Sequence, residues 1–226
     1  MINKISPTLL DAVSCIPDGA SVMVSGFGDS GLPRELLSAL LEHSAKDLTI
    51  ISNNAGTGTT GLAGLIAAGR VRRMVCSYPK SSGADVFADW YRSGRIELEL
   101  VPQGTLIERM RAAGSGLGPF FTPTGYDTEV AQGKEQRVYN GKGYVLEEPL
   151  GADFALVKAG LADRWGNLSY RLAGRSFGPV MCMAARVAIA QVDDIVPLGA
   201  IAPEAVVTPG IFVSRVVRKD ERRASN

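Results

Sequence analysis

Three side-chain amides in this sequence are candidates for chemistry: Asn53, Asn54 and Gln103. Each closely follows a short apolar run with strand character, so each is predicted at or near the end of a strand. An amide N–H can donate to a carbonyl or an oxyanion without being consumed, which suits acyl transfer. We interpret the three amides as a carbonyl-binding set. The alternative is that they only form and cap turns.

A glycine-rich segment after the first predicted strand is a candidate ligand-binding loop. It reads Gly26-Phe27-Gly28-Asp29-Ser30-Gly31, and residues 56–61 repeat its glycine spacing after the next strand. Glycine lets a ligand approach the backbone, and a helix predicted to begin at Pro33 would present free amide hydrogens to an anion. We therefore expect a phosphate-bearing ligand or an oxyanion. The alternative is a tight turn that binds nothing.

Binding of NAD by an oxidoreductase is a second interpretation of the same glycine pattern. It requires an acid at the end of the second strand, for the ribose hydroxyls. The sequence has Asn53 and Asn54 at that place, and Asp47 precedes the strand. The amides therefore disfavour a dinucleotide site.

Histidine and cysteine chemistry is restricted by the composition. The only histidine, His43, ends a helical pattern, where it suits the negative end of the helix dipole. A serine or cysteine nucleophile with a histidine base, or a zinc centre with several histidines, is therefore disfavoured. Cys15, Cys76 and Cys182 are too far apart for a zinc motif and too few for a disulfide framework. We expect buried thiols and no metal.

The carboxylates do not supply an evident nucleophile either. Glu108 is flanked by arginines on a predicted helix, which is typical of a surface ion pair. Glu97 and Glu99 alternate with apolar residues on a predicted strand and are expected to face outward. We therefore expect a site that lacks a reactive group of its own.

Charge and hydropathy exclude other classes. The 226 residues include 24 Lys and Arg against 23 Asp and Glu, a net charge of +1, which argues against nucleic acid as the main partner. The sequence has no apolar run of about 18 residues to span a membrane, and it begins without an apolar leader. We expect a cytoplasmic protein.

The elements that must position these residues alternate along the first half of the chain. Apolar runs at residues 21–24, 48–51, 71–77 and 96–101 are separated by helical patterns, which predicts right-handed βαβ units. Later segments include a hairpin around Asn140-Gly141. We predict an α/β fold: an open, mostly parallel twisted sheet with flanking helices and added antiparallel strands. Residues 1–218 form one domain in this prediction, and residues 219–226 form a polar tail.

Residues 18–33, Asp-Gly-Ala-Ser-Val-Met-Val-Ser-Gly-Phe-Gly-Asp-Ser-Gly-Leu-Pro, resemble the first signature of family I CoA-transferases. Ser25 stands where that family usually has glycine. Further matching segments extend the resemblance over about residues 3–217, and they lie at residues 52–56, 102–106, 121–126, 153–159 and 163–167. The resemblance implies the fold of that family and the use of a coenzyme A thioester as substrate, with no permanent cofactor.

The likeness is to the α subunit of two-component 3-oxoacid CoA-transferases. It implies that the partner is a β subunit, in an αβ or α2β2 assembly, and the catalytic glutamate of the family lies on that β subunit. The glutamate would attack the acyl-CoA thioester, giving an acyl-glutamyl anhydride and then a glutamyl-CoA thioester.

Carried over to this chain, the resemblance places Gln103 beside the reacting thioester carbonyl. It places Asn53 and Asn54 along the acyl pocket, and the segment Gly26-Phe27-Gly28-Asp29-Ser30-Gly31 at coenzyme A.

The finer likeness, in residues 76–80 and 164–168, is to members that move CoA from succinyl-CoA to 3-oxoadipate in aromatic-compound breakdown. The second carboxylate of such acids calls for a cation, and Lys80 is the candidate, with a solvated loop lysine as the alternative. Two other interpretations stay open: a preference for acetoacetate, butyrate or glutaconate, and a sensor without catalysis.

Overall fold

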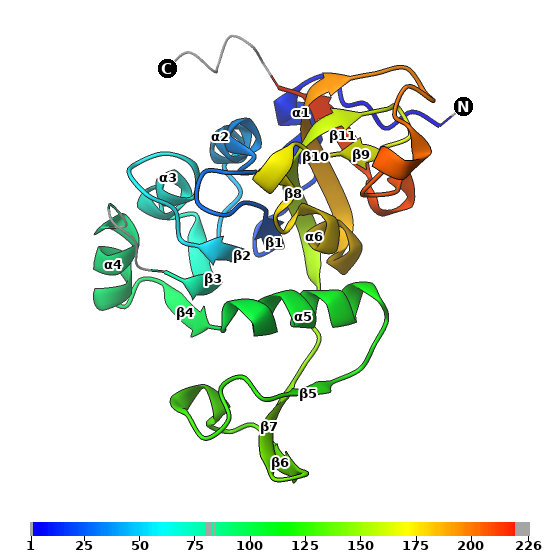
Figure 1. Cartoon of the computed structure of the whole chain (residues 1–226). Coiled ribbons are helices and arrows are strands. Elements are labelled where there is room, and N and C mark those ends of the chain that lie inside the picture. Colours follow the sequence, from blue (N-terminus) through cyan, green and yellow to red (C-terminus); the bar gives the residue numbers. More distant parts are fainter. Residues whose placement is uncertain (1, 80–82, 84, 220–226) are drawn as a thin grey trace.

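The computed structural model describes residues 2–79, 83 and 85–219. Its central sheet has the strand order β11-β10-β8-β1-β2-β3-β4, with every neighbouring pair parallel, and β9 pairs antiparallel with β8 (Figure 1). The strands are β1 (Ser21–Val24), β2 (Leu48–Asn54), β3 (Val71–Tyr78), β4 (Glu97–Leu100), β8 (Ala152–Ala162), β9 (Leu168–Ser169), β10 (Ala185–Ile195) and β11 (Arg215–Arg218). The predicted α/β fold with a mostly parallel sheet is confirmed.

Helices cover both faces of this sheet and enclose two apolar cores. The alternation of side chains along each strand divides them: Val22 and Val24 belong to the core under α1, α2, α3 and α4, whereas Met23 belongs to the core under α5 and α6. The helices are α1 (Leu9–Val13), α2 (Arg34–His43), α3 (Gly61–Ala67), α4 (Asp85–Arg92), α5 (Gln103–Gly114) and α6 (Gly178–Ala184). Short 3-10 turns are η1 (Glu129–Ala131), η2 (Leu172–Arg175), η3 (Pro203–Ala205) and η4 (Gly210–Phe212).

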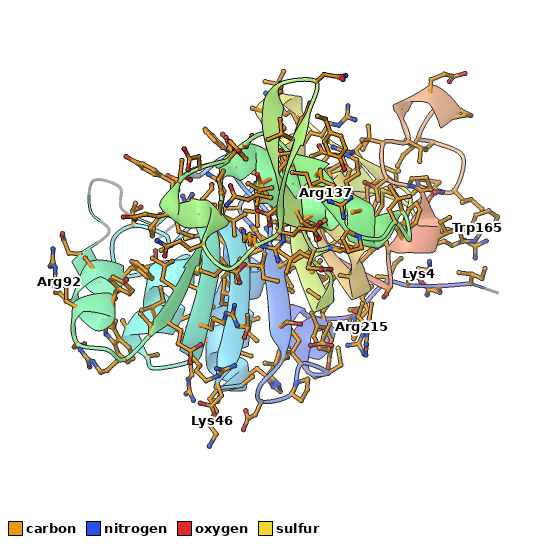
Figure 2. All side chains as sticks on the ribbon, turned by 90° about the horizontal axis from the view of Figure 1, so that it is seen from below. Lys4, Lys46, Arg92, Arg137, Trp165 and Arg215 are labelled. Atoms are coloured by element: carbon orange, nitrogen blue, oxygen red, sulfur yellow. The ribbon has the colours of Figure 1, made fainter. Side chains whose placement is uncertain are left out.

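The predicted hairpin forms, but it does not extend the central sheet. Strands β5 (Phe120–Thr122), β7 (Lys142–Glu147) and β6 (Gln136–Tyr139) make a separate antiparallel sheet on the far side of α5 (Figure 1). Asn140 and Gly141 have φ values of 50° and 76°, as a type I′ turn requires. Figure 2 shows Arg137 on this small sheet, where its guanidinium lies 5.0 Å from the centre of the Phe121 ring.

Buried charges attach the small sheet to α5. Glu147, only 2% exposed, lies 2.7 Å from the ammonium of Lys134 and 3.8 Å from the guanidinium of Arg109. Arg109 also pairs with Glu99 on β4, at 2.8 Å. Because removing one partner would leave a buried charge without compensation, this set ties the position of α5 to both sheets.

The N-terminal segment runs beside the last strand. Lys4 donates its backbone N–H to the carbonyl of Arg164 (2.9 Å) and its ammonium to the carbonyl of Gly210 (2.6 Å). Lys4 and Trp165 lie at the end of the molecule opposite to Arg92 (Figure 2). Among the described residues, no helix is long and apolar enough to cross a membrane.

Candidate active site

The glycine loop lies where the order of the parallel strands changes direction. β1 is flanked by β2 on one side and by β8 on the other, and ligands of open α/β sheets bind beyond the carboxyl ends of strands at such a point. Ser25 fastens the loop there: its N–H donates to Leu156, its hydroxyl donates to the carbonyl of Gly31 (2.7 Å), and it accepts the N–H of Lys158 (3.2 Å). A serine in place of the usual glycine thus closes the loop and joins it to β8.

The loop itself is a tight turn. The backbones of Phe27 and Ser30 exchange two hydrogen bonds, of 2.9 and 3.2 Å, and Gly28 and Asp29 form the tip. Gly31 has φ +75°, and a Cβ built on it would lie 2.4 Å from the carbonyl oxygen of Gly174. Gly28 has φ +57°, with nothing within 4 Å of the same position. The two glycines therefore differ in packing while sharing a left-handed backbone.

This difference predicts unequal costs of substitution. Gly28→Ala is expected to lower the free energy of unfolding by about 1–2 kcal/mol, the cost of a left-handed backbone. Gly31→Ala adds a backbone clash, for a total of about 3 kcal/mol or more, or about 6–12 °C in Tm for a chain of this size. Thermal unfolding of the purified variants measures both. Equal losses would show that Gly174 yields to the new methyl group.

A cavity of about 390 Å³ lies between the two glycine loops. Its lining includes the apolar residues Leu32 and Leu62 and the amide residues Asn53 and Asn54. The remaining lining residues are Phe27, Gly28, Asp29, Arg34, Gly56, Thr57, Thr60 and Tyr78. The structure therefore brings both predicted asparagines and part of the predicted glycine segment to one cavity.

Gln103 joins this site through Asn53. Its amide nitrogen Nε2 donates to Asn53 Oδ1 at 2.9 Å, and its side chain is exposed, whereas Asn53 is 5% exposed. Gln103 is the first residue of α5, although the sequence pattern predicts that helix from Leu106. One hydrogen of the Gln103 amide is occupied by Asn53, and the second is available to an acceptor.

Asn54 forms a turn, which was the alternative to carbonyl binding for the three amides. Its Oδ1 accepts the backbone N–H of Gly56 at 2.9 Å, an Asx turn that begins the second glycine loop. Its side chain still lines the cavity. Lys80, the candidate for the second carboxylate, lies outside the described residues.

The expectation that α2 offers its free amide hydrogens to an anion is wrong for two of its first three residues. The N–H of Arg34 donates to the carbonyl of Leu32 (3.0 Å), and that of Leu36 donates to the side chain of Gln191 (3.2 Å). Gln191 is fully buried on β10 and also donates to the carboxylate of Glu35. The helix start is therefore partly capped by the protein, and local sequence patterns contain no signal for a cap from so distant a strand.

A second cavity, of about 380 Å³, lies on the other side of the glycine loop. Asp29, Ser30 and Gly31 line it, together with residues that the sequence analysis did not single out, notably Lys158 and Arg171. Lys158 lies 3.9 Å from Asp193 across neighbouring strands. The available signal was the place of Lys158 within residues 153–159, one of the segments that carry the family resemblance. The loop thus forms a wall between two cavities.

The reactive side chains are not arranged for nucleophilic attack in the described part of the chain. Burial raises the pKa of Cys76 and of Cys182 to about 12, so both remain neutral thiols. His43 is hydrogen-bonded to the carbonyl of Ile16 (3.0 Å). Asp29, the carboxylate in the larger cavity, is paired with Arg34 at 2.6 Å.

The other candidate carboxylates are engaged in ion pairs. Glu108 pairs with Arg111 at 3.1 Å, as predicted. Burial raises the pKa of Glu99, but hydrogen bonds and the positive charges of Arg109 and Arg73 outweigh burial and hold that pKa below its usual value. No group of three or more His, Cys, Asp or Glu side chains among the described residues is placed to bind a metal.

Comparison with known proteins gives a consistent result. The family model described as Coenzyme A transferase matches residues 7–219. The chain is 58% identical to the A subunit of 3-oxoadipate CoA-transferase from Pseudomonas putida, over 100% of this chain and 98% of the relative. It is 54% identical to the protein of the same name from Acinetobacter baylyi, over 100% of this chain and 99% of the relative.

A solved structure shares the fold. Glutaconate coenzyme A-transferase from Acidaminococcus fermentans superposes with a TM-score of 0.84 at 21% sequence identity, covering 95% of this chain and 75% of that one. The family match covers nearly the whole chain, including both glycine loops and the Asn53–Gln103 amide pair. This chain belongs to the coenzyme A transferase family.

Proposed function

We propose that this chain is the α subunit of a two-component CoA-transferase that moves CoA from succinyl-CoA to 3-oxoadipate. The observation that carries the proposal is the exposed Gln103 amide, which is anchored through the buried Asn53 and keeps one N–H free. An amide of this kind stabilises the oxyanion of an acyl-transfer intermediate. The acceptor is the acid in the names of the full-length relatives, and succinyl-CoA is the donor in the name of a further relative, 48% identical over 89% of this chain.

The reaction then divides between two subunits. The β subunit provides a glutamate that attacks the succinyl-CoA carbonyl and expels CoA thiolate, which leaves a succinyl-glutamyl anhydride. The thiolate attacks the glutamyl carbonyl, giving glutamyl-CoA and free succinate. The 3-oxoadipate carboxylate repeats these steps in reverse and leaves as 3-oxoadipyl-CoA. Each attack places negative charge on a carbonyl oxygen, and Gln103 donates to that oxygen.

The two cavities suit the two parts of an acyl-CoA. The larger one is lined by apolar residues and by two asparagines from the end of β2, which suits a short acyl chain whose carbonyl lies near Asn53. The segment Gly26 to Gly31 separates it from the second cavity, so coenzyme A on this loop would lie beside the acyl group. The capping of α2 by Gln191 favours contact with the loop backbone over contact with the helix start.

Acid preference in the assembled enzyme tests the proposal. With succinyl-CoA as donor, kcat/KM for 3-oxoadipate is expected to exceed that for acetoacetate by about 10- to 100-fold, the value of one charge-assisted hydrogen bond. Initial rates at several fixed concentrations of both substrates should give the parallel lines of a ping-pong mechanism. Preference for acetoacetate, butyrate or glutaconate would contradict the substrate assignment while leaving the family intact.

Lys80 is the proposed reader of the second carboxylate, on the grounds of its charge and its place after β3. Lys80→Ala should then raise KM for 3-oxoadipate and leave KM for acetoacetate unchanged. Lys46→Ala is the matched control, because Lys46 points outward at the rim of the molecule (Figure 2). Equal effects of Lys80→Ala on both acids would remove Lys80 from this role.

A further inference from the structure

The hydroxyl of Ser77 belongs to the amide site, and the mechanism proposed above gives it no role. Ser77 lies on β3, next to Asn53 on β2, and its Oγ is 2.7 Å from Asn53 Oδ1 and 3.1 Å from the Asn53 backbone oxygen. We propose that Ser77 is a positioning residue for the transfer reaction, which fixes the Asn53 amide and through it the amide of Gln103. This inference rests on the role proposed for Gln103.

In the structure the oxygen end of the Asn53 amide faces both of its neighbours. Asn53 Oδ1 is 2.7 Å from the Ser77 hydroxyl and 2.9 Å from Gln103 Nε2, and these are the usual lengths of an O–H···O and an N–H···O bond. With the Asn53 amide rotated by half a turn, its nitrogen would face Gln103, which would have to accept through Oε1. The Gln103 N–H groups would then point elsewhere. Two donors on one oxygen therefore hold the Gln103 amide with its nitrogen inward.

The surroundings of Ser77 make it a rigid support. Val75, two residues earlier on the same face of β3, is buried in the core under α5, and Tyr78 is in register with Asn54. Asn53 is nearly inaccessible, so water has little room to replace a lost hydroxyl. The exposed Gln103 is therefore held by a chain of two hydrogen bonds that ends in the sheet.

Substitution of Ser77 in the enzyme assembled with its β subunit tests this. Ser77→Ala is expected to lower kcat about 10-fold with less than a twofold change in KM, because the second donor is lost and the amides can rotate. Ser77→Thr keeps the hydroxyl and should stay within about threefold of wild type. Thr105→Val is the matched control: Thr105 lies on α5 and is 2% exposed, and its hydroxyl is buried without a partner in the described part of the chain. It should leave kcat unchanged.

A double-substitution cycle separates positioning from general support of the fold. In a Gln103→Ala background, adding Ser77→Ala should change kcat by less than about 1.5-fold, because the group that Ser77 positions is gone. A tenfold loss that persists in this background, or full activity of Ser77→Ala in the wild-type background, would overturn the inference while leaving the role of Gln103 in place. Full activity of Gln103→Ala alone would instead overturn both.

Discussion

Purified without a partner, this chain is expected to transfer no CoA. The Ser77 hydroxyl donates to Asn53 Oδ1, which also accepts a hydrogen bond from the Gln103 amide. In the described part of the chain, this hydroxyl lies beside amides and not beside a base. A serine without a base is a poor nucleophile. The Asp29 carboxylate, which lines the larger cavity, forms an exposed ion pair with Arg34, and the Cys76 thiol stays protonated because burial raises its pKa to about 12. This fits the proposed mechanism, in which this chain binds and stabilises and the β subunit supplies the attacking group.

Addition of the β subunit should raise the rate by at least about 10³-fold, the usual order for loss of a catalytic nucleophile. Thioester transfer is followed with each subunit separately and with the mixture. After incubation with succinyl-CoA and no acceptor, mass spectrometry should find CoA bound to the β subunit but none on this chain. Turnover by this chain alone would contradict the division of the site. In that case, this chain would carry covalently bound CoA. Loss of that CoA in the Asp29→Asn variant would identify Asp29 as the nucleophile.

Local patterns predicted the first four strands of the central sheet because each one is set by residues close together in the sequence. The edge strand β11 was not predicted, because its short basic run resembles a solvated terminus, whereas pairing with β10 makes it a strand. The run at residues 48–51 was visible as a short apolar segment, because its side chains pack into both cores: Leu48 and Ile50 into one and Ile51 into the other. The pairing of the strands in the small sheet, by contrast, is not set by neighbouring residues in the sequence. Whether the hairpin joined the central sheet or formed its own was decided by contacts with β5 and by the buried Glu147, which no local pattern contains.

The same distinction holds within the site. Gln103, Asn53 and Asn54 were predicted because amides at strand ends are visible in the sequence. The start of α5 at Gln103 was missed, since Pro102 and Gly104 favour a turn in isolation, whereas Pro102 here occupies the position before the first helical residue. The cap of α2 by Gln191 joins a helix to the distant strand β10, and the contact of Ser77 with Asn53 joins β3 to β2. Only the folded sheet brings such pairs together.

Gln103→Ala should lower kcat in the assembled enzyme by about 10²- to 10³-fold, the usual effect of removing one oxyanion donor. KM should change little, because the interaction strengthens only when negative charge develops on the carbonyl oxygen. The side chain is exposed, so its removal costs little stability, and thermal unfolding together with binding to the β subunit verifies that the variant is intact. Gln132→Ala, an exposed glutamine outside both cavities, is the matched control.

Gln103→Glu distinguishes donation from simple filling of space. Glutamate has nearly the same shape, but when ionised it only accepts hydrogen bonds, and it repels both Asn53 Oδ1 and the developing oxyanion. Its kcat should therefore be as low as that of Gln103→Ala or lower. If both variants turned over near the wild-type rate, Gln103 would have no place in the chemistry. If only the glutamate variant were active, the side chain would serve as a spacer and not as a donor.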